Sequence, residues 1–83
     1  MKWKIRYRKQ AYKFITEKKI NGLVESKILS YLKGNIADVK KLKGNWKNHL
    51  RLRIGKIRVI FSIDKSQKII DIKKADYRGD IYN

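Results

Sequence analysis

The stretch "LRLRIGKIRVIF", residues 50–61, contains two runs of alternating apolar and polar side chains on either side of a Gly-Lys pair. Strict alternation is typical of a β-strand with one buried face, because successive side chains point to opposite faces of a sheet. Gly55 and Lys56 interrupt the alternation where a two-residue hairpin turn of the Gly-X type fits. The stretch therefore predicts a β-hairpin with strands at 49–54 and 57–63.

A two-residue turn determines which residues of the two strands lie opposite one another. In the predicted register, Leu52 faces Val59 on the buried side, and Arg53 faces Arg58 on the other side, with Arg51 two residues along the same face. Like charges directly opposite in a sheet destabilise it by roughly 0.2–1 kcal/mol, so folding gains nothing from this cluster. Planar guanidinium groups bind phosphate oxygens in pairs, and the cluster therefore favours a phosphate-binding surface over an ordinary solvated sheet face.

The remaining pattern predicts an α+β domain. We expect residues 1–83 to form a single domain in the order β-α-α-β-β-β, with a helical hairpin on one face of a mainly antiparallel sheet. Residues 35–48 have mixed polarity and predict a long connection. The predicted elements are a strand at 3–8, a helix ending near Lys18 or Lys19, a second helix with an apolar stripe from Val24 to Leu32, and strands at 49–54, 57–63 and 68–74.

The last hairpin is predicted from its apolar residues. Pairing Phe61 with Ile70 keeps both side chains on the buried face and places Lys73 next to Arg58. Lys73 would then belong to the basic cluster. Asp71 would face the same side, where its carboxylate could orient arginines.

The charge of the chain is its strongest compositional signal. Lys and Arg number 23 against 7 Asp and Glu, which gives a net charge of +16. Self-repulsion at this charge destabilises a compact domain, so we expect a polyanionic partner, and nucleic acid ahead of an acidic protein or a membrane surface.

Cysteine is absent, which excludes disulfides and thiolate chemistry. No apolar run approaches the roughly 18–20 residues that span a membrane, and no signal-peptide core follows Met1, so we expect a cytoplasmic protein.

The order of elements, together with "DVKKLKGN" (38–45), "LRLRIGKIRVIF" and the ending "DYRGDIY" (76–82), resembles the RelE/ParE superfamily of toxin–antitoxin toxins over nearly the whole chain. The resemblance implies a compact domain with a helical hairpin on one sheet face and a concave basic face opposite. It also implies a neighbouring antitoxin that neutralises the protein. Resemblance to the RelE branch implies an endoribonuclease that cuts mRNA in the ribosomal A site without a cofactor or metal.

The resemblance also implies which residues carry the activity. The implied catalytic residues are Arg53, Arg58, Arg78 and Tyr82, and the predicted RNA- and phosphate-binding residues are Arg51, Lys43, Lys47, Lys73 and Tyr77. Some RelE members have lysines where this chain has Arg51 and Arg53, and many relatives have histidine at the position of Tyr77. Arginine stays protonated in proteins and cannot act as a base, which leaves Tyr82 as the leading candidate for proton transfer. Tyr82 could instead stack on a base or pin the tail by packing.

Two other functions remain open at this point. A ParE-like toxin would act on DNA gyrase through protein contacts and cleave nothing itself. A non-catalytic basic domain would bind RNA through charge alone. ParE relatives generally lack the full basic and tyrosine set, so Arg53, Arg58, Arg78 and Tyr82 favour the ribonuclease.

Overall fold

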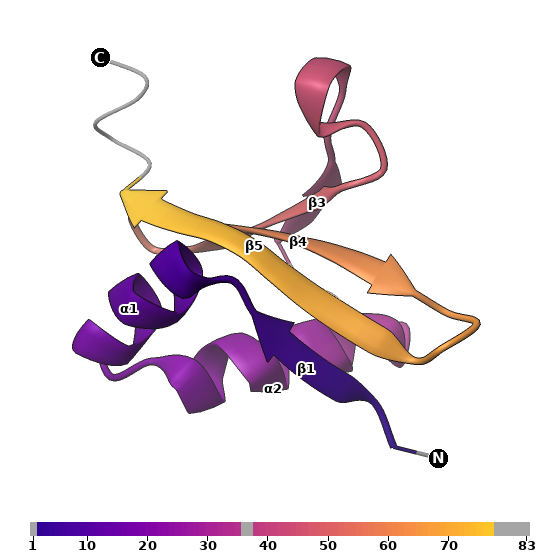
Figure 1. The fold of residues 1–83 in the computed structure, drawn as a ribbon, viewed down its shortest axis with the longest axis horizontal. Coiled ribbons are helices and arrows are strands. Elements are labelled where there is room, and N and C mark those ends of the chain that lie inside the picture. The colour runs from indigo at the N-terminus through magenta and orange to yellow at the C-terminus, as the bar shows by residue number, and fades with distance from the viewer. Residues whose placement is uncertain (1, 36–37, 78–83) are drawn as a thin grey trace.

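A five-stranded mixed sheet carries two helices on one of its faces (Figure 1). The computed structural model describes residues 2–35 and 38–77. Its elements are β1 (Lys4–Tyr7), α1 (Lys9–Glu17), α2 (Asn21–Leu32), β2 (Val39–Lys41), a short 3-10 helix η1 (Gly44–Trp46), β3 (Leu50–Ile54), β4 (Ile57–Asp64) and β5 (Ile69–Tyr77). The strand order is β1-β5-β4-β3-β2; β1 runs parallel to β5, and all other neighbours are antiparallel. The predicted α+β class, with its helices on one face, is confirmed.

The core lies between the helices and this face of the sheet. Helix α1 is amphipathic, and both helices bury apolar side chains against the strands at the predicted helical spacing. The fully buried apolar residues are Ala11 and Ile15 of α1, Val24 and Ile28 of α2, and Leu52, Val59, Phe61, Ile70, Ile72 and Ala75 of the sheet. No helix in the described residues is long and apolar enough to cross a membrane.

Strand β2 is an element that the sequence did not predict. Within the predicted connection 35–48, residues Val39–Lys41 pair antiparallel with β3 and form an edge of the sheet. A strand of three residues shows too little alternation to be recognised in the sequence. Val39 pairs with Leu52 and packs against the core.

The β3–β4 hairpin has the predicted register. Leu52 pairs with Val59, and Arg53 pairs with Arg58. Gly55 begins the turn with φ +57°, a left-handed conformation that glycine adopts at little cost.

The β4–β5 hairpin differs from the prediction. Phe61 pairs with Ile72, two residues from its predicted partner. The carboxylate of Asp64 accepts hydrogen bonds from the backbone N–H groups of Ser66 (3.1 Å) and Gln67 (3.1 Å), and this holds a four-residue turn between the strands. A shift of two residues leaves every side chain on its predicted face, so the apolar pattern could not detect it.

A β-bulge shifts the two strands by one further residue. The irregularity lies between Ile60 and Phe61, and it leaves Lys73 without a directly opposite residue. Arg58 consequently pairs with Asp76, and the predicted placement of Lys73 beside Arg58 is wrong. An opposite charge therefore stands where the prediction placed a like charge.

Candidate nucleic-acid interface

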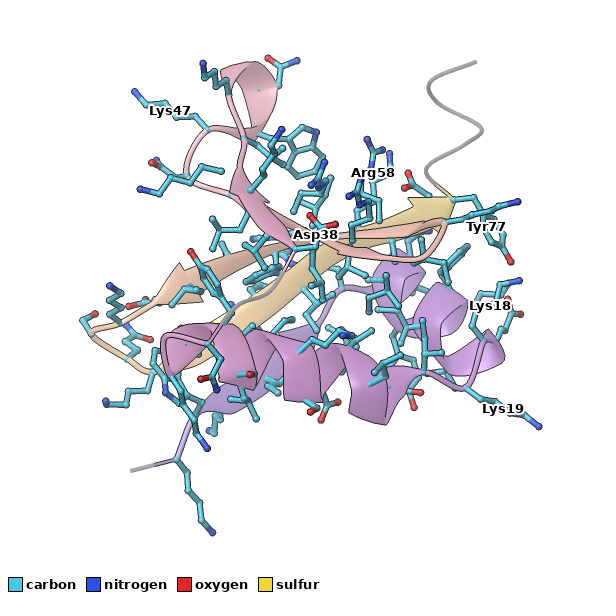
Figure 2. All side chains as sticks on the ribbon, turned by 180° about the vertical axis from the view of Figure 1, so that it is seen from behind. Lys18, Lys19, Asp38, Lys47, Arg58 and Tyr77 are labelled. Atoms are coloured by element: carbon cyan, nitrogen blue, oxygen red, sulfur yellow. The ribbon has the colours of Figure 1, made fainter. Side chains whose placement is uncertain are left out.

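Strands β3 and β4 place three arginines on the sheet face that points away from the helices. Leu52 and Val59 are fully buried against the helices, so the alternation of the strands directs Arg51, Arg53 and Arg58 to the opposite side. Figure 2 shows Arg58 on this side, with the helices on the other. We call this side of the sheet the open face.

Asp38 binds both arginines of β3. Its carboxylate accepts hydrogen bonds from Nη2 of Arg51 at 3.2 Å and from Nε of Arg53 at 2.5 Å. The backbone N–H of Arg53 also donates to the carbonyl oxygen of Asp38 (3.0 Å). The Arg51 side chain is 13% exposed and that of Arg53 is 40% exposed. Arg53 is therefore the more accessible of the two to a ligand.

Asp76 holds the arginine of β4. Nε and Nη2 of Arg58 donate to the two carboxylate oxygens of Asp76 at 3.2 and 3.1 Å, a bidentate pair that fixes the plane of the guanidinium group. Asp38 and Asp76 explain why the sheet tolerates Arg53 directly opposite Arg58. Sequence reasoning missed both aspartates, because their roles depend on an unpredicted edge strand and on the bulge.

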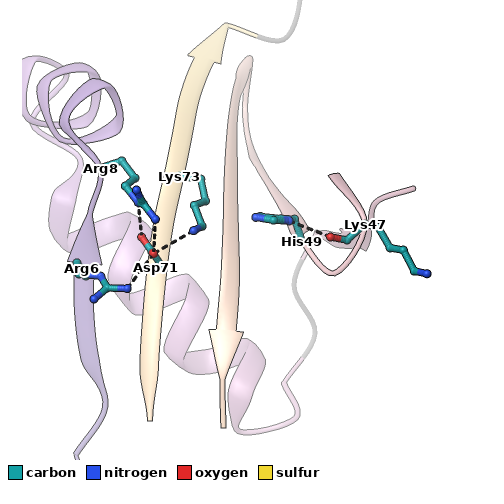
Figure 3. A network of polar contacts seen from close by, with 6 residues as sticks. All are labelled: Arg6, Arg8, Lys47, His49, Asp71 and Lys73. Carbon is teal, nitrogen blue, oxygen red and sulfur yellow. Dashed lines mark hydrogen bonds and ion pairs between the residues drawn. The ribbon is translucent and has the colours of Figure 1, made fainter. Parts of the chain in front are cut away.

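Lys73 belongs to a second cluster on the open face. Its Nζ lies 3.1 Å from the carboxylate of Asp71, which also accepts hydrogen bonds from Arg6 (3.1 Å) and Arg8 (3.3 Å), as Figure 3 shows. Burial raises the pKa of the Asp71 carboxyl, but the hydrogen bonds from Lys73, Arg8 and Arg6 outweigh it and hold this pKa below its usual value. Asp71 orients arginines, as expected, although they are those of β1. The alternation of "WKIRYR" signals the polar face of β1 but not its place beside β5.

Lys43 and Lys47 flank η1 in the segment that joins β2 to β3. Both are exposed, and Figure 2 shows Lys47 in the part of the chain that projects away from the helices. The ring of His49 packs edge-on against Trp46 at 5.1 Å between centroids, and its Nδ1 lies 3.1 Å from the carbonyl oxygen of Lys47. His49 thus has a structural role in this segment.

The structure does not bring Tyr77 together with the arginines. Its ring packs edge-on against Phe14 of α1, with 5.3 Å between centroids, and Nζ of Lys18 lies 4.7 Å from the ring centre. Tyr77 and Lys18 lie side by side in Figure 2. Arg78 and Tyr82 lie outside the described residues, so their convergence with the arginines of β3 and β4 stays a prediction.

The chain also has a groove of about 520 Å³, lined by residues that include Tyr31, His49, Leu50 and Ile63. None of the three arginines of β3 and β4 lines it.

Across residues 2–35 and 38–77, no group of three or more His, Asp or Glu side chains is arranged to hold a metal ion. The open face presents planar guanidinium groups, which can bind phosphate oxygens.

No family model matches the sequence, and no curated protein matches it significantly. Solved structures do match. The archaeal RelE–RelB complex from Pyrococcus horikoshii is 27% identical (TM-score 0.63; 95% of this chain, 98% of that one). The YoeB dimer from Staphylococcus aureus is 25% identical (TM-score 0.64; 93% and 98%). The toxin–antitoxin complex RelBE2 from Mycobacterium tuberculosis is 18% identical and shares the fold (TM-score 0.67; 94% and 100%).

These likenesses extend over nearly the whole chain and over nearly the whole of each neighbour. The fold is that of toxins from toxin–antitoxin systems. The chain belongs to the RelE-like toxin superfamily.

Proposed function

We propose that this chain is a toxin that cleaves mRNA on the ribosome. The observation that carries the proposal is the gathering of Arg51, Arg53 and Arg58 on the open face of a RelE-like fold. Asp38 and Asp76 offset the repulsion between these arginines, and the Arg53 side chain stays 40% exposed, which leaves N–H donors of its guanidinium group available to phosphate oxygens. The net charge of +16 supports a polyanionic target.

RNA supplies its own nucleophile for this reaction. The oxygen of a ribose 2′-hydroxyl attacks the adjacent phosphorus, the bond from phosphorus to the 5′-oxygen breaks, and a cyclic phosphate and a 5′-hydroxyl result. One proton leaves the 2′-oxygen, and one is delivered to the departing 5′-oxygen. Arg53 and Arg58 would neutralise the negative charge that builds up on the phosphate in the transition state. Asp38 and Asp76 would preserve their orientation, so little reorganisation is needed during the reaction.

The removal of the 2′-hydroxyl proton is assigned to the C-terminal tail through the family resemblance, and water would supply the proton that the departing 5′-oxygen takes up. Tyr82 would accept the proton of the 2′-hydroxyl, and Arg78 would contact the phosphate. A phenol has a pKa near 10, so a base that works at neutral pH needs its phenolate stabilised by about three pKa units. Neighbouring guanidinium groups shift a phenol in that direction.

An antitoxin is the expected partner, because the structural neighbours include the RelE–RelB and RelBE2 complexes. Its acidic residues would meet the basic surface of this chain. Expression of the chain alone should therefore stop growth, and co-expression of the antitoxin encoded beside it should restore growth. Normal growth with folded chain present would contradict a toxin.

The activity itself is tested by adding the purified chain to a translating extract and mapping message ends. Breaks that follow the reading frame are expected, because cleavage in the A site moves with the ribosome by codons. Intact messages would contradict the proposal, and intact messages with damaged DNA would indicate the gyrase-directed activity of ParE-like toxins instead.

A further inference from the structure

Asp71 is a buried carboxylate surrounded by more positive charge than it needs. Its side chain is 6% exposed, and it is bound by Arg6, Arg8 and Lys73 at 3.1–3.3 Å. One cation would neutralise it, but three surround it, so the cluster carries a net charge of +2 (three cations against one carboxylate). In a chain of net charge +16, the two additional cations increase self-repulsion.

The excess charge is accessible. The side chains of Arg6 and Arg8 are 62% and 58% exposed, although one nitrogen or more of each binds the buried carboxylate. A guanidinium has five N–H donors in a fixed plane, so an arginine anchored at its inner edge presents its outer edge to solvent in a fixed orientation. Lys73, whose side chain is 23% exposed, is the third cation that contacts the Asp71 carboxylate (Figure 3).

The cluster lies on the same face as the arginines of β3 and β4, but toward the opposite edge of the sheet. Arg6 pairs with Asp71 across β1 and β5, whereas Arg53 lies on β3, three strand spacings from β1. At about 4.8 Å per spacing, Arg6 and Arg53 are about 14 Å apart across the sheet, and Asp71 on β5 is about 10 Å from β3. An anion bound by the cluster would therefore not be the phosphate that Arg53 contacts.

We infer that Arg6, Arg8 and Lys73, anchored by Asp71, form a second phosphate-binding site that holds the backbone of RNA. The inference rests on the proposed function in so far as it takes RNA as the ligand. The site positions the RNA and takes no part in bond cleavage, because Arg53 lies two strands away from Asp71, and Arg58 lies four residues along β4 from Ser62, the residue opposite Asp71. Its contribution is affinity that decreases with salt.

The test measures binding at several salt concentrations with the double variant Arg6→Gln/Arg8→Gln. Its matched control is Lys13→Gln/Lys27→Gln, which removes the same charge from exposed positions on α1 and α2. The probes are a 12-nucleotide 2′-O-methyl oligouridine, which cannot be cleaved through its 2′-oxygen, and vacant ribosomes. Loss on both probes identifies any RNA backbone as ligand, and loss on ribosomes alone identifies ribosomal RNA.

For the oligonucleotide, each lost phosphate contact reduces the slope of log affinity against log salt by about 0.7. We therefore expect the Arg6/Arg8 variant to lose about 1.4 from the slope, with the control near wild type. Affinity and slope that are unchanged on both probes, or an equal loss in the control, overturn the inference. Thermal unfolding monitors folding; if the double variant unfolds, Arg6→Gln alone leaves Arg8 and Lys73 on Asp71 and should lose about half as much.

Failure of this site and failure of the nuclease are separable. Wild-type protein that binds the oligonucleotide but does not cut messages would leave the second site standing without the nuclease. Wild-type protein that cuts messages, with an Arg6/Arg8 variant that binds both probes as tightly as wild type, would overturn only the second site. Wild-type protein that binds neither probe would overturn both.

Discussion

Arg53 and Arg58 lie directly opposite each other in the sheet, and each guanidinium is neutralised by a different aspartate. Asp38 is shared with Arg51, so the open face keeps a positive charge while the two guanidinium groups are held in fixed directions. A bound phosphate gains from donors that are already oriented, because the side-chain entropy has been lost on folding. Because negative charge on the phosphate increases in the transition state, the effect of a substitution at such a residue should be larger on catalysis than on binding.

The first residue-scale prediction concerns Arg58→Gln. Removal of one preorganised donor to a developing oxyanion typically slows a reaction by about 10²–10³-fold, and we expect a loss of this size in single-turnover cleavage on ribosomes. Binding to ribosomes should weaken much less. The control is Lys27→Gln, which removes one exposed charge from α2. A cleavage rate within a factor of two of the Lys27→Gln rate would exclude Arg58 from the reaction.

A second prediction concerns Tyr82→Phe, which removes only the phenolic hydroxyl. If Tyr82 transfers a proton, cleavage should slow by about 10²–10⁴-fold while affinity for a 2′-O-methyl message analogue stays the same. If Tyr82 packs or stacks only, the phenyl ring serves equally and the rate is unchanged. Single-turnover rates and equilibrium binding of the same preparation separate the two roles.

A third prediction concerns the stability of Asp71→Asn and its dependence on pH. The pKa of Asp71 is lowered in the folded chain, so its carboxylate stabilises the fold above the unfolded-state pKa of about 3.9. This stabilisation is lost as the pH falls through the lower, folded-state value. We expect the variant to be less stable than wild type by roughly 1–3 kcal/mol at pH 7. The difference should shrink toward pH 2 in urea unfolding, and a difference independent of pH would contradict the assignment.

At the scale of elements, the β3–β4 hairpin could be predicted and the β4–β5 hairpin only in part. The alternation of side chains and the two-residue Gly-X turn determine the register of the β3–β4 hairpin. In the β4–β5 hairpin, a register shifted by two residues leaves every side chain on the same sheet face, so the sequence pattern cannot distinguish the two registers. The bulge that leaves Lys73 unpaired depends on backbone geometry. The sequence therefore predicted which arginines share a face but assigned the wrong partner to Arg58. It also missed the pairing of β1 with β5, which brings Arg6 to Asp71.

The fourth prediction belongs to the β3–β4 turn. Gly55 has φ +57°, and a Cβ there would meet no atom within 4 Å, so Gly55→Ala tests backbone strain alone. We expect a loss of about 1–2 kcal/mol in the free energy of unfolding. Gly22, in helix α2, has equally open surroundings without positive φ, so Gly22→Ala should instead stabilise by about 0.5–1 kcal/mol. Thermal unfolding that showed the same sign for both variants would contradict this account.

At the scale of the whole molecule, the helices cover one sheet face and leave the other to cationic side chains. The α+β fold class could be predicted from the pattern of apolar residues, the positive charge of the surface from the composition, and the superfamily from the order of motifs. Each of these is a property of the sequence as a whole. Three aspartates of seven acidic residues hold the arginines of the open face. The sequence predicted that Asp71 could orient arginines, but the partners of all three aspartates appear only once distant strands are paired. Long-range pairing of this kind has no local sequence signal.

The most direct test of the account uses ribosomes stalled on a message with one defined codon in the A site. Wild-type protein should cut that codon and leave the same message intact without ribosomes. Arg53→Gln/Arg58→Gln should lose the cut, while Lys13→Gln/Lys27→Gln, with the same net charge, should keep it. An intact codon with wild-type protein, or equal cutting by both variants, would contradict the claim that the arginines of this sheet face perform the reaction.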